Sequence, residues 1–502
     1  MLKRFRKEQT VLERQTWRDY QTRHKKAAAA REKLIRTIFR SNRETIRKRP
    51  GWREYQDGLK KTAVQEKLIK RFVKYATIVS LSLVVLYEMI GWFEDTAYRH
   101  PQKNETALPS ADSPSSSGPD CRKLLKKGEV RNLLGSKNLV NLTDKSFVLS
   151  LDGRNFRVDT SLDIPLQNFI EKNLDRSTSR YIGIVAMDPS TGKILSMVGL
   201  DKTDQSSNPC IDTRFPAASI FKIVTAAAAI EKCGFNSGTT LTYNGMKHTL
   251  YKSQIDDRRN KYTNRITFQD SFAQSVNPVF GKIGALYLGK NALEKYAEAF
   301  GFNRNIDFEI PLAPSIVSVS DKPYQWAEIA CGFNRMTRIS PLHGALMASV
   351  ILNEGNLIEP TIIDRIIDEQ GTAIYRSRVK ALNQAIKPES SKAVNNLMKA
   401  TIQSGTCRKL FNGYRKDRIL SKLNIGGKTG SIDDTSHQTR FDWFIGFAQE
   451  KGGDEKIALS VVVAHEKYIG KRAGYYAKIM MKEYFRDYFA KKSPDQINIA
   501  RN

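Results

Sequence analysis

The chain has 502 residues, enough to bury at least one large core, and its formal net charge is +30 at pH 7. Its five cysteines include no C-x-x-C pair, which excludes a dense disulfide framework and disfavours a structural zinc site. The charge favours an acidic partner, but nucleic acid is not expected, because charge is the only feature that supports it.

The basic residues are concentrated at the N-terminus. Residues 1–93 contain 24 Lys and Arg against 9 Asp and Glu, which is half of the net charge. Within them, residues 1–74 are polar and helix-prone, with Trp17, Phe39 and Trp52 among the Lys and Arg. We interpret residues 1–74 as a cytoplasmic tail, which is a solvated segment, an amphipathic helix on anionic lipid, or a partner-binding arm.

Residues 75–93 (YATIVSLSLVVLYEMIGWF) form an apolar run that only Glu88 interrupts. As a helix, a run of about 19 residues approaches the ~30 Å of a bilayer's hydrocarbon core. Lys and Arg precede the run, whereas Glu94 and Asp95 follow it, so the positive-inside rule places the N-terminus in the cytoplasm. The sequence therefore predicts a single-pass, uncleaved helix in the cytoplasmic (inner) membrane, with the rest of the chain in the periplasm or another extracytoplasmic space. A buried core helix is the alternative.

Two segments separate this helix from a globular domain. Residues 94–120 are rich in Ser and Pro and carry too few apolar side chains to fold, so they form a linker. Residues 121–178 form a small pedestal segment. It contains a predicted hairpin, with strands at 147–151 and 155–160, and a predicted amphipathic helix at 163–173.

From residue 179 the pattern is that of an α+β domain, which extends to residue 490 and leaves 491–502 as a C-terminal tail. A helical middle at about 218–354 separates two early strands from three late ones, and a final helix follows at about 475–490. This order predicts one antiparallel five-stranded sheet flanked by helices, an α/β sandwich, rather than βαβ repeats. The expected strands are 181–187, 193–199, 425–431, 442–448 and 457–464.

Ser219 and Lys222 open an apolar, alanine-rich helix in the stretch FPAASIFKIVTAAAAIE. Residues three apart share a helix face, so the Lys222 amine can reach the Ser219 hydroxyl. A lysine acts as a base only when it is neutral, which burial and a nearby cation favour. The S-x-x-K pattern is weak evidence by itself, because Ser377-Arg-Val-Lys380 also matches it, within a charged stretch.

Two further motifs follow Ser219 in the chain. Ser275-Val-Asn277 places a hydroxyl and a carboxamide in one turn, although an Asx-type turn that caps the next helix explains it equally well. Lys428-Thr429-Gly430-Ser431 follows two glycines on a predicted strand, where a substrate backbone can approach closely. Lys428 offers a positive field for a carboxylate, and Thr429 offers a hydroxyl.

In this order, S-x-x-K, S-x-N and K-T-G resemble the signature of the penicillin-binding proteins and serine β-lactamases. The similarity extends over roughly residues 158–485, including VAMDPSTGKILSMVG and DWFIGFA, which resemble the family's first hairpin and the strand after K-T-G. The resemblance implies a monofunctional, class B-like penicillin-binding protein with its transpeptidase domain at 179–490. It implies no cofactor and no metal.

The resemblance also implies a role for each motif residue. Ser219 is the expected nucleophile toward the D-Ala–D-Ala carbonyl of a stem peptide, and Lys222 is its general base. Ser275 relays the proton to the leaving D-alanine. Asn277 holds the substrate amide, Lys428 and Thr429 bind the terminal carboxylate, and Gly430 belongs to the same substrate-binding strand. The backbone N–H groups of Ser219 and Ser431 form the oxyanion hole.

The expected activity is therefore cross-linking of peptidoglycan stem peptides, with β-lactams as inhibitors that acylate Ser219. About 85 residues separate the membrane segment from Tyr181, too few for a glycosyltransferase domain, so we expect a separate glycosyltransferase and other cell-wall proteins as partners. Two alternatives remain open. One is a D,D-carboxypeptidase or β-lactamase-type hydrolase, and the other is a penicillin-binding sensor or scaffold.

Overall fold

The computed structural model describes residues 124–499, so the predicted cytoplasmic tail, membrane segment and linker lie outside the described residues. Within residues 124–499 no helix has the length and apolar content needed to cross a bilayer. The α-helices are α3 (Lys127–Leu134), α4 (Ile164–Lys172), α5 (Lys222–Cys233), α6 (Lys252–Ile255), α7 (Phe268–Ala273), α8 (Asn277–Lys282), α9 (Gly289–Ala299), α10 (Pro323–Cys331), α11 (Pro341–Leu352), α12 (Pro388–Gln403) and α13 (Ala473–Ile499). The strands are β1 (Ser146–Leu151), β2 (Arg154–Thr160), β3 (Ser179–Met187), β4 (Ile194–Asp201), β5 (Phe215–Pro216), β6 (Thr240–Tyr243), β7 (Asn264–Thr267), β8 (Arg338–Ile339), β9 (Asn356–Ile358), β10 (Ile363–Ile367), β11 (Ala373–Arg376), β12 (Ala381–Gln384), β13 (Leu423–Asp433), β14 (Arg440–Glu450) and β15 (Lys456–His465).

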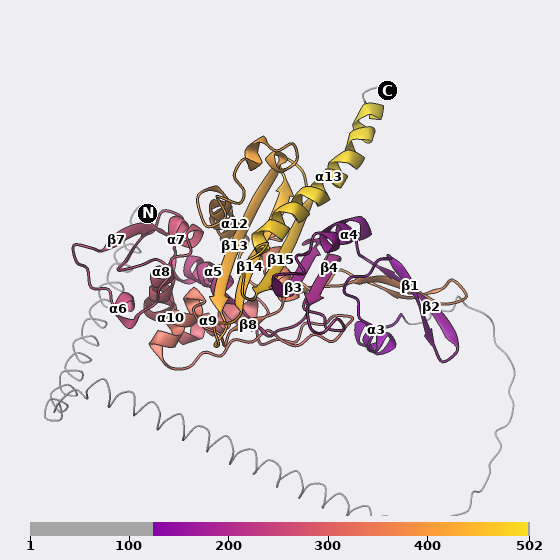
Figure 1. Cartoon of the computed structure of the whole chain (residues 1–502), viewed down its shortest axis with the longest axis horizontal. Helices are drawn as coiled ribbons and strands as arrows, with labels where there is room; N and C mark the ends of the chain where they lie inside the picture. The colour runs from indigo at the N-terminus through magenta and orange to yellow at the C-terminus, as the bar shows by residue number, and fades with distance from the viewer. Residues whose placement is uncertain (1–123, 500–502) are drawn as a thin grey trace, which may run out of the picture. The chain divides into compact units, whose positions relative to one another are not determined.

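A five-stranded sheet in the order β13-β14-β15-β3-β4 forms the centre of the fold (Figure 1). All neighbouring strands in it are antiparallel. The predicted α+β class and five-stranded antiparallel sheet are therefore confirmed. Each predicted strand overlaps one of these five, and only Lys193 of the predicted residues lies outside, just before β4. Because β3 pairs with β15, the first and last parts of the domain meet in one sheet.

Helices cover both faces of this sheet. Helix α11 packs on β3, β14 and β15 from one side. Helix α13 packs on β14 and β15 from the other side, where it crosses the sheet in Figure 1. Successive residues on β15 alternate between the two cores, since Val461 and Val463 face the α13 side and Val462 faces the α11 side. Burial on both faces explains why the late strands are almost continuously apolar in sequence.

The pedestal segment is not a separate unit. Its predicted hairpin forms as β1 and β2, but β2 also pairs with β10, and β10 pairs with β11. The resulting sheet has the order β1-β2-β10-β11, so the predicted division at residue 178 separates strands that share one sheet. Pairing between distant segments leaves no local signal, which is why the hairpin alone was predicted.

The two helices predicted at 163–173 and about 475–490 are both present, but they begin or end at other residues than predicted. Helix α4 begins after Asp163, whose carboxylate accepts a hydrogen bond from the Leu166 backbone N–H at 3.0 Å. Helix α13 continues to Ile499 instead of ending near residue 490, so most of the predicted C-terminal tail is helical.

Tight packing of α11 on the sheet generates a first prediction. A Cβ on Gly344 would lie 2.9 Å from the Ile445 side chain and even closer to Ser460 Oγ. We expect Gly344→Val to lower the free energy of unfolding by about 1–3 kcal/mol, the usual cost of overpacking. Urea denaturation monitored by tryptophan fluorescence measures it. Gly128→Ala is the control, because Gly128 lies on α3 with open space around it, and this change should be neutral or stabilising. Equal effects of the two substitutions would contradict the prediction.

Candidate active site

Ser219 lies on a short 3₁₀ turn, η2 (Ala218–Phe221), that leads directly into α5. Its side chain is partly exposed, whereas Ala218 beside it is buried and adopts φ +50°, a conformation uncommon for a residue with a Cβ. The preceding strand β5 is fixed in place because the Trp443 indole N–H donates to the Pro216 carbonyl at 2.9 Å. The surrounding structure therefore holds the Ser219 hydroxyl at the surface of a buried, strained turn.

Lys222 is completely buried one turn after Ser219. Its Nζ lies 2.8 Å from Ser219 Oγ, 2.8 Å from Asn277 Oδ1 and 2.5 Å from the Cys331 carbonyl oxygen. Burial lowers the pKa of this amine to about 8. A neutral amine can donate its two N–H groups to Asn277 and Cys331, and its lone pair then faces the Ser219 hydroxyl. This arrangement is that of a serine with its general base.

Asn277, the first residue of α8, orients this amine. Its Nδ2 donates to the His248 carbonyl at 3.0 Å, which turns the amide oxygen toward Lys222. The sequence analysis expected Asn277 to hold a substrate amide, and the structure adds a contact with the base. One hydrogen on Nδ2 remains for a substrate.

Lys428 is the second buried amine of the site. Its Nζ donates to Ser275 Oγ and to the Thr429 carbonyl, both at 2.9 Å. Burial, and then repulsion by Lys222, lower the pKa of Lys428 well below its ordinary value. Ser275 itself adopts φ +56°, so its hydroxyl is held in place by a strained backbone. The K-T-G motif predicts that Lys428 offers a positive field to a substrate carboxylate, and in the structure its amine lies behind Ser275.

Strand β13 passes directly beside the Ser219 turn. A Cβ on Gly430 would lie 3.2 Å from the Ser219 backbone nitrogen, so glycine permits the close approach of the two segments. Next to it, Ser431 is exposed, and its hydroxyl donates to Asp442 at 2.9 Å. On the other side, the Thr429 and Thr406 hydroxyls lie 2.6 Å apart. The strand edge therefore presents backbone and hydroxyl groups to one side of Ser219.

A cleft of about 450 Å³ connects these groups. Six of the eight sequence-predicted site residues line it, and Lys222 and Lys428 are buried behind it. The second S-x-x-K match is elsewhere, since Lys380 forms an ion pair with Glu359. Within residues 124–499 no group of His, Cys, Asp and Glu is arranged to hold a metal ion. The lining residues from the three motifs are Ser219, Ser275, Asn277, Thr429, Gly430 and Ser431.

Sequence reasoning missed other residues of the cleft. The Cys331 carbonyl contacts Lys222, and Gly332, Thr406 and His248 line the cleft. Cys331 acts through its backbone oxygen, so its residue type carries no signal. The other three belong to none of the motifs and are brought to the cleft by the fold. Gly332 alone carries a signal in the sequence, because a glycine directly after a predicted helix often ends that helix in a left-handed conformation.

Gly332 generates a second prediction. It has φ +72°, and a Cβ there would collide with the carbonyl oxygen of Ala218. Because Gly332→Ala displaces both the Ser219 turn and the neighbouring Cys331 carbonyl, we expect acylation of Ser219 by a fluorescent penicillin to slow by about 10²-fold or more.

The matched control for this substitution is Gly452→Ala. Gly452 has nearly the same backbone conformation, φ +73°, in a turn with open space around it. The Gly452→Ala variant should lose a similar free energy of unfolding, about 1–2 kcal/mol, and its Ser219 should be acylated at the wild-type rate. If both variants acylate equally fast, contact with the Ser219 turn is not what makes Gly332 necessary.

The chain is similar to known proteins over most of the domain that contains this cleft. Residues 182–486 match the family model described as penicillin binding protein transpeptidase domain. The chain is 26% identical to stage V sporulation protein D of Bacillus subtilis, over 61% of this chain and 49% of that protein. It is 25% identical to peptidoglycan D,D-transpeptidase PbpA of Mycolicibacterium smegmatis, over 56% of this chain and 61% of that protein. The chain thus spans less than two thirds of the length of either relative.

Solved structures show the same fold. The D,D-transpeptidase domain of a peptidoglycan glycosyltransferase from Eggerthella lenta superposes with a TM-score of 0.54 at 21% identity, covering 66% of this chain and 82% of that one. PBPA from Mycobacterium tuberculosis gives 0.51 at 21% identity, covering 65% and 79%. Since the family model covers more than half of its residues, this chain belongs to the penicillin-binding protein transpeptidase family.

Proposed function

We propose that this chain is a membrane-bound, serine-type D,D-transpeptidase that cross-links peptidoglycan stem peptides through an acyl-enzyme on Ser219. The observation that carries the proposal is the 2.8 Å separation between the buried Lys222 amine and the partly exposed Ser219 hydroxyl, beside a K-T-G strand. One relative is itself called a peptidoglycan D,D-transpeptidase, which supports this substrate class.

In the acylation step, neutral Lys222 accepts the hydroxyl proton as Ser219 Oγ attacks the carbonyl carbon of the D-Ala–D-Ala bond. Negative charge develops on the carbonyl oxygen. The backbone N–H groups of Ser219 and Ser431 stabilise it, because β13 runs beside the turn at Gly430. The C–N bond then breaks and leaves the acyl group on Ser219.

Ser275 and Lys428 act on the leaving group. Ser275 passes its hydroxyl proton to the departing D-alanine nitrogen and recovers a proton from Lys428, its hydrogen-bond donor at 2.9 Å. The paired hydroxyls of Thr406 and Thr429 bind the terminal carboxylate, whose negative charge favours the protonated form of the buried Lys428 amine. Asn277 holds the substrate amide through its remaining N–H. An amine from a second stem peptide then attacks the acyl carbon, and the proton that it loses passes through Ser275 to Lys428. Lys222 returns its proton to the Ser219 oxygen as the ester bond breaks, which restores both lysines and the hydroxyl.

The setting of this reaction completes the proposal. The apolar run at 75–93 holds the chain in the cytoplasmic membrane with the described domain on the outer side. A separate glycosyltransferase supplies the glycan strands, and the pedestal segment precedes the transpeptidase domain. β-Lactams acylate Ser219 in place of the stem peptide.

The Lys222 pKa of about 8 generates a third prediction. The base must be neutral, so the active fraction falls as pH decreases below this pKa. We expect the second-order rate constant for acylation by penicillin to decrease about tenfold per pH unit below pH 7 and to level off above about pH 9. Stopped-flow fluorescence measures the rate, and an unfolding curve at each pH controls for stability. A rate constant that stays flat from pH 6 to 8 would refute Lys222 as the base.

The acyl-enzyme generates a fourth prediction. Fluorescent penicillin should label the full-length chain at Ser219, as located by peptide mass spectrometry, and the label should persist for many minutes. Ser219→Ala and Lys222→Met should abolish labelling. Lys380→Met is the matched control, because it removes the lysine of the other S-x-x-K match, and it should label normally. Labelling at any residue other than Ser219 contradicts the proposal.

The products distinguish the proposal from its alternatives. With a pentapeptide donor and an amine acceptor, a transpeptidase yields cross-linked dimer, whereas a carboxypeptidase yields tetrapeptide. Loss of the penicillin label within seconds indicates a hydrolase. A cell whose morphology is unchanged by Ser219→Ala but altered by deletion of residues 1–74 would indicate a scaffold.

A further inference from the structure

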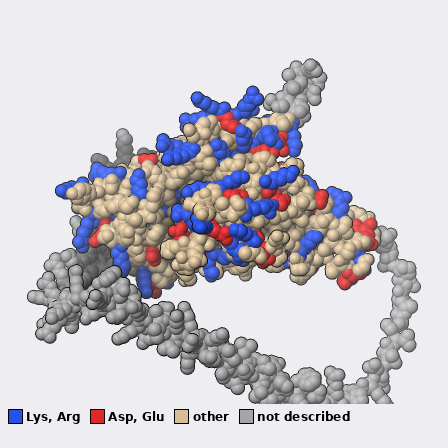
Figure 2. Space-filling view, in the orientation of Figure 1, with Lys and Arg blue, Asp and Glu red and all other residues tan. Residues whose placement is uncertain are grey.

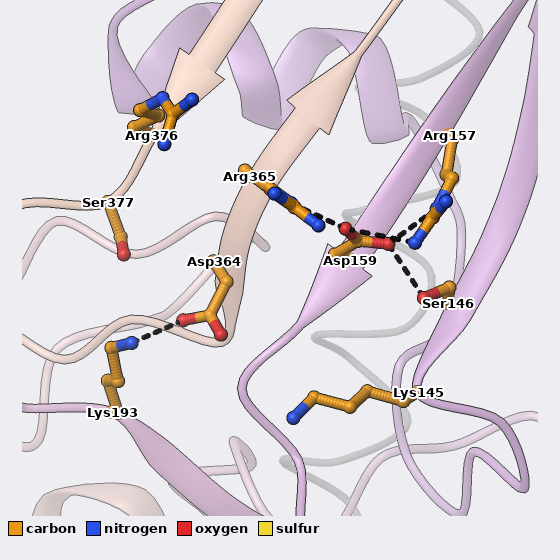
Figure 3. Close-up of a pocket in the computed structure, with 9 residues that line it drawn as sticks. All are labelled: Lys145, Ser146, Arg157, Asp159, Lys193, Asp364, Arg365, Arg376 and Ser377. Carbon is orange, nitrogen blue, oxygen red and sulfur yellow. Dashed lines mark hydrogen bonds and ion pairs between the residues drawn. The ribbon is translucent and has the colours of Figure 1, made fainter. Parts of the chain in front are cut away.

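A second hollow, of about 480 Å³, lies where the β1-β2-β10-β11 sheet faces the turn between β3 and β4 (Figure 3). It shares no lining residue with the catalytic cleft. Five Lys and Arg side chains line it against two carboxylates. Lys and Arg also predominate over Asp and Glu on the visible face of the described chain (Figure 2). The hollow is therefore locally basic.

One row of residues crosses all four strands of the sheet and forms the wall of this hollow. Ser146 on β1 pairs with Asp159 on β2, Asp159 pairs with Arg365 on β10, and Arg365 pairs with Arg376 on β11. Two arginines thus lie directly opposite each other on adjacent antiparallel strands. Like charges in this position destabilise a sheet unless an anion compensates them.

The buried carboxylate of Asp159 organises one side of the row. It accepts hydrogen bonds from Ser146 at 2.7 Å, from Arg157 at 2.9 Å and from Arg365 at 2.6 Å. Although burial opposes it, these bonds lower the pKa of Asp159, so its carboxylate stays charged. Both guanidinium groups are thereby fixed in orientation, and each keeps further N–H donors for another acceptor.

Two further cations of the hollow, Lys145 and Arg376, have no side-chain partner among the described residues. Among residues 124–499, the side chains of Lys145, Arg376 and Ser377 make no ion pair or hydrogen bond, and Figure 3 shows Lys145 and Arg376 on opposite sides of the space. Lys193 is paired with Asp364 at 2.8 Å. Free donors therefore converge on the hollow from β11, from the start of β1 and from the loop after β11.

We propose that this hollow binds a phosphate group of a phosphate ester. Arginine forks and a lysine amine bind phosphate and carboxylate oxygens strongly. Donors that approach from several sides match a tetrahedral phosphate better than a planar carboxylate, which accepts bonds mainly in one plane. The phosphate can belong to a soluble ester or to a lipid headgroup. The proposal goes beyond the transpeptidase function and does not depend on it.

The test measures binding of pyrophosphate, as a soluble probe, to the full chain in detergent. Hydrogen exchange monitored by mass spectrometry should show protection of residues 145–160 and 363–377, a local readout that the basic N-terminal tail does not affect. Arg376→Ser and Lys145→Ser should each weaken this protection about tenfold in apparent Kd. Arg376→Lys should weaken pyrophosphate binding less than Arg376→Ser, because lysine keeps the positive charge. A thermal unfolding curve of each variant confirms that it is folded.

Arg154→Ser is the matched control. Arg154 is an exposed cation on β2 that does not line the hollow, and its loss should change the apparent Kd less than twofold. An equal loss in this variant and in Arg376→Ser would mean that diffuse charge attracts the probe, and the proposal would fail. Unchanged binding in both Arg376→Ser and Lys145→Ser overturns it as well, and so does equal competition by acetate.

Competition identifies the source of the phosphate. Displacement of pyrophosphate by glycerol 3-phosphate supports a soluble ester. Displacement by phosphatidate vesicles, but not by phosphatidylcholine vesicles, supports a lipid headgroup. In that case the phosphatidate vesicles should bind the Arg376→Ser variant more weakly than the Arg154→Ser variant.

Discussion

The burial of the Lys222 amine is the constraint on which the candidate site depends. When an ammonium group is buried away from water, its pKa falls unless a negative charge lies beside it. The Lys222 amine has no such counter-charge, because the atoms that contact it are neutral oxygens of Ser219, Asn277 and Cys331. A pKa of about 8 instead of 10.5 corresponds to roughly 3 kcal/mol in favour of the neutral form. The turn before α5, the start of α8 and the end of α10 meet where they can contact this amine.

The central fold could be predicted because its signals are local. Four of the five strands contain an apolar run, and strands that are buried on both faces keep this pattern along their length. The fifth, β13, was recognised instead by its paired glycines and the K-T-G motif. The four-stranded sheet could not be predicted, because β10 pairs with β2 across about 200 positions of sequence and such a pairing leaves no local signal. Helix α13 was predicted too short for a related reason, since its polar last turns lack the apolar period.

For the site, residue type decided what could be predicted. The motif residues act through their side chains, so Ser219, Lys222 and Lys428 are recognisable from the sequence and lie together in the structure. The carbonyl groups of Cys331 and His248 act through the backbone, which every residue shares. The burial of the Lys428 amine could not be predicted either, because the sequence pattern of a strand does not indicate which residues cover the edge of the sheet.

The long separation between β2 and β10 affects how the chain is made. Synthesis delivers the first hairpin well before its partner strands, and an isolated two-stranded hairpin is at best marginally stable in water. Until β10 has emerged at residue 367, the outer edge of β2 is an open template for mispairing with other chains. A truncation between the two halves would leave this edge uncovered permanently, so the pedestal cannot be excised as an independent module.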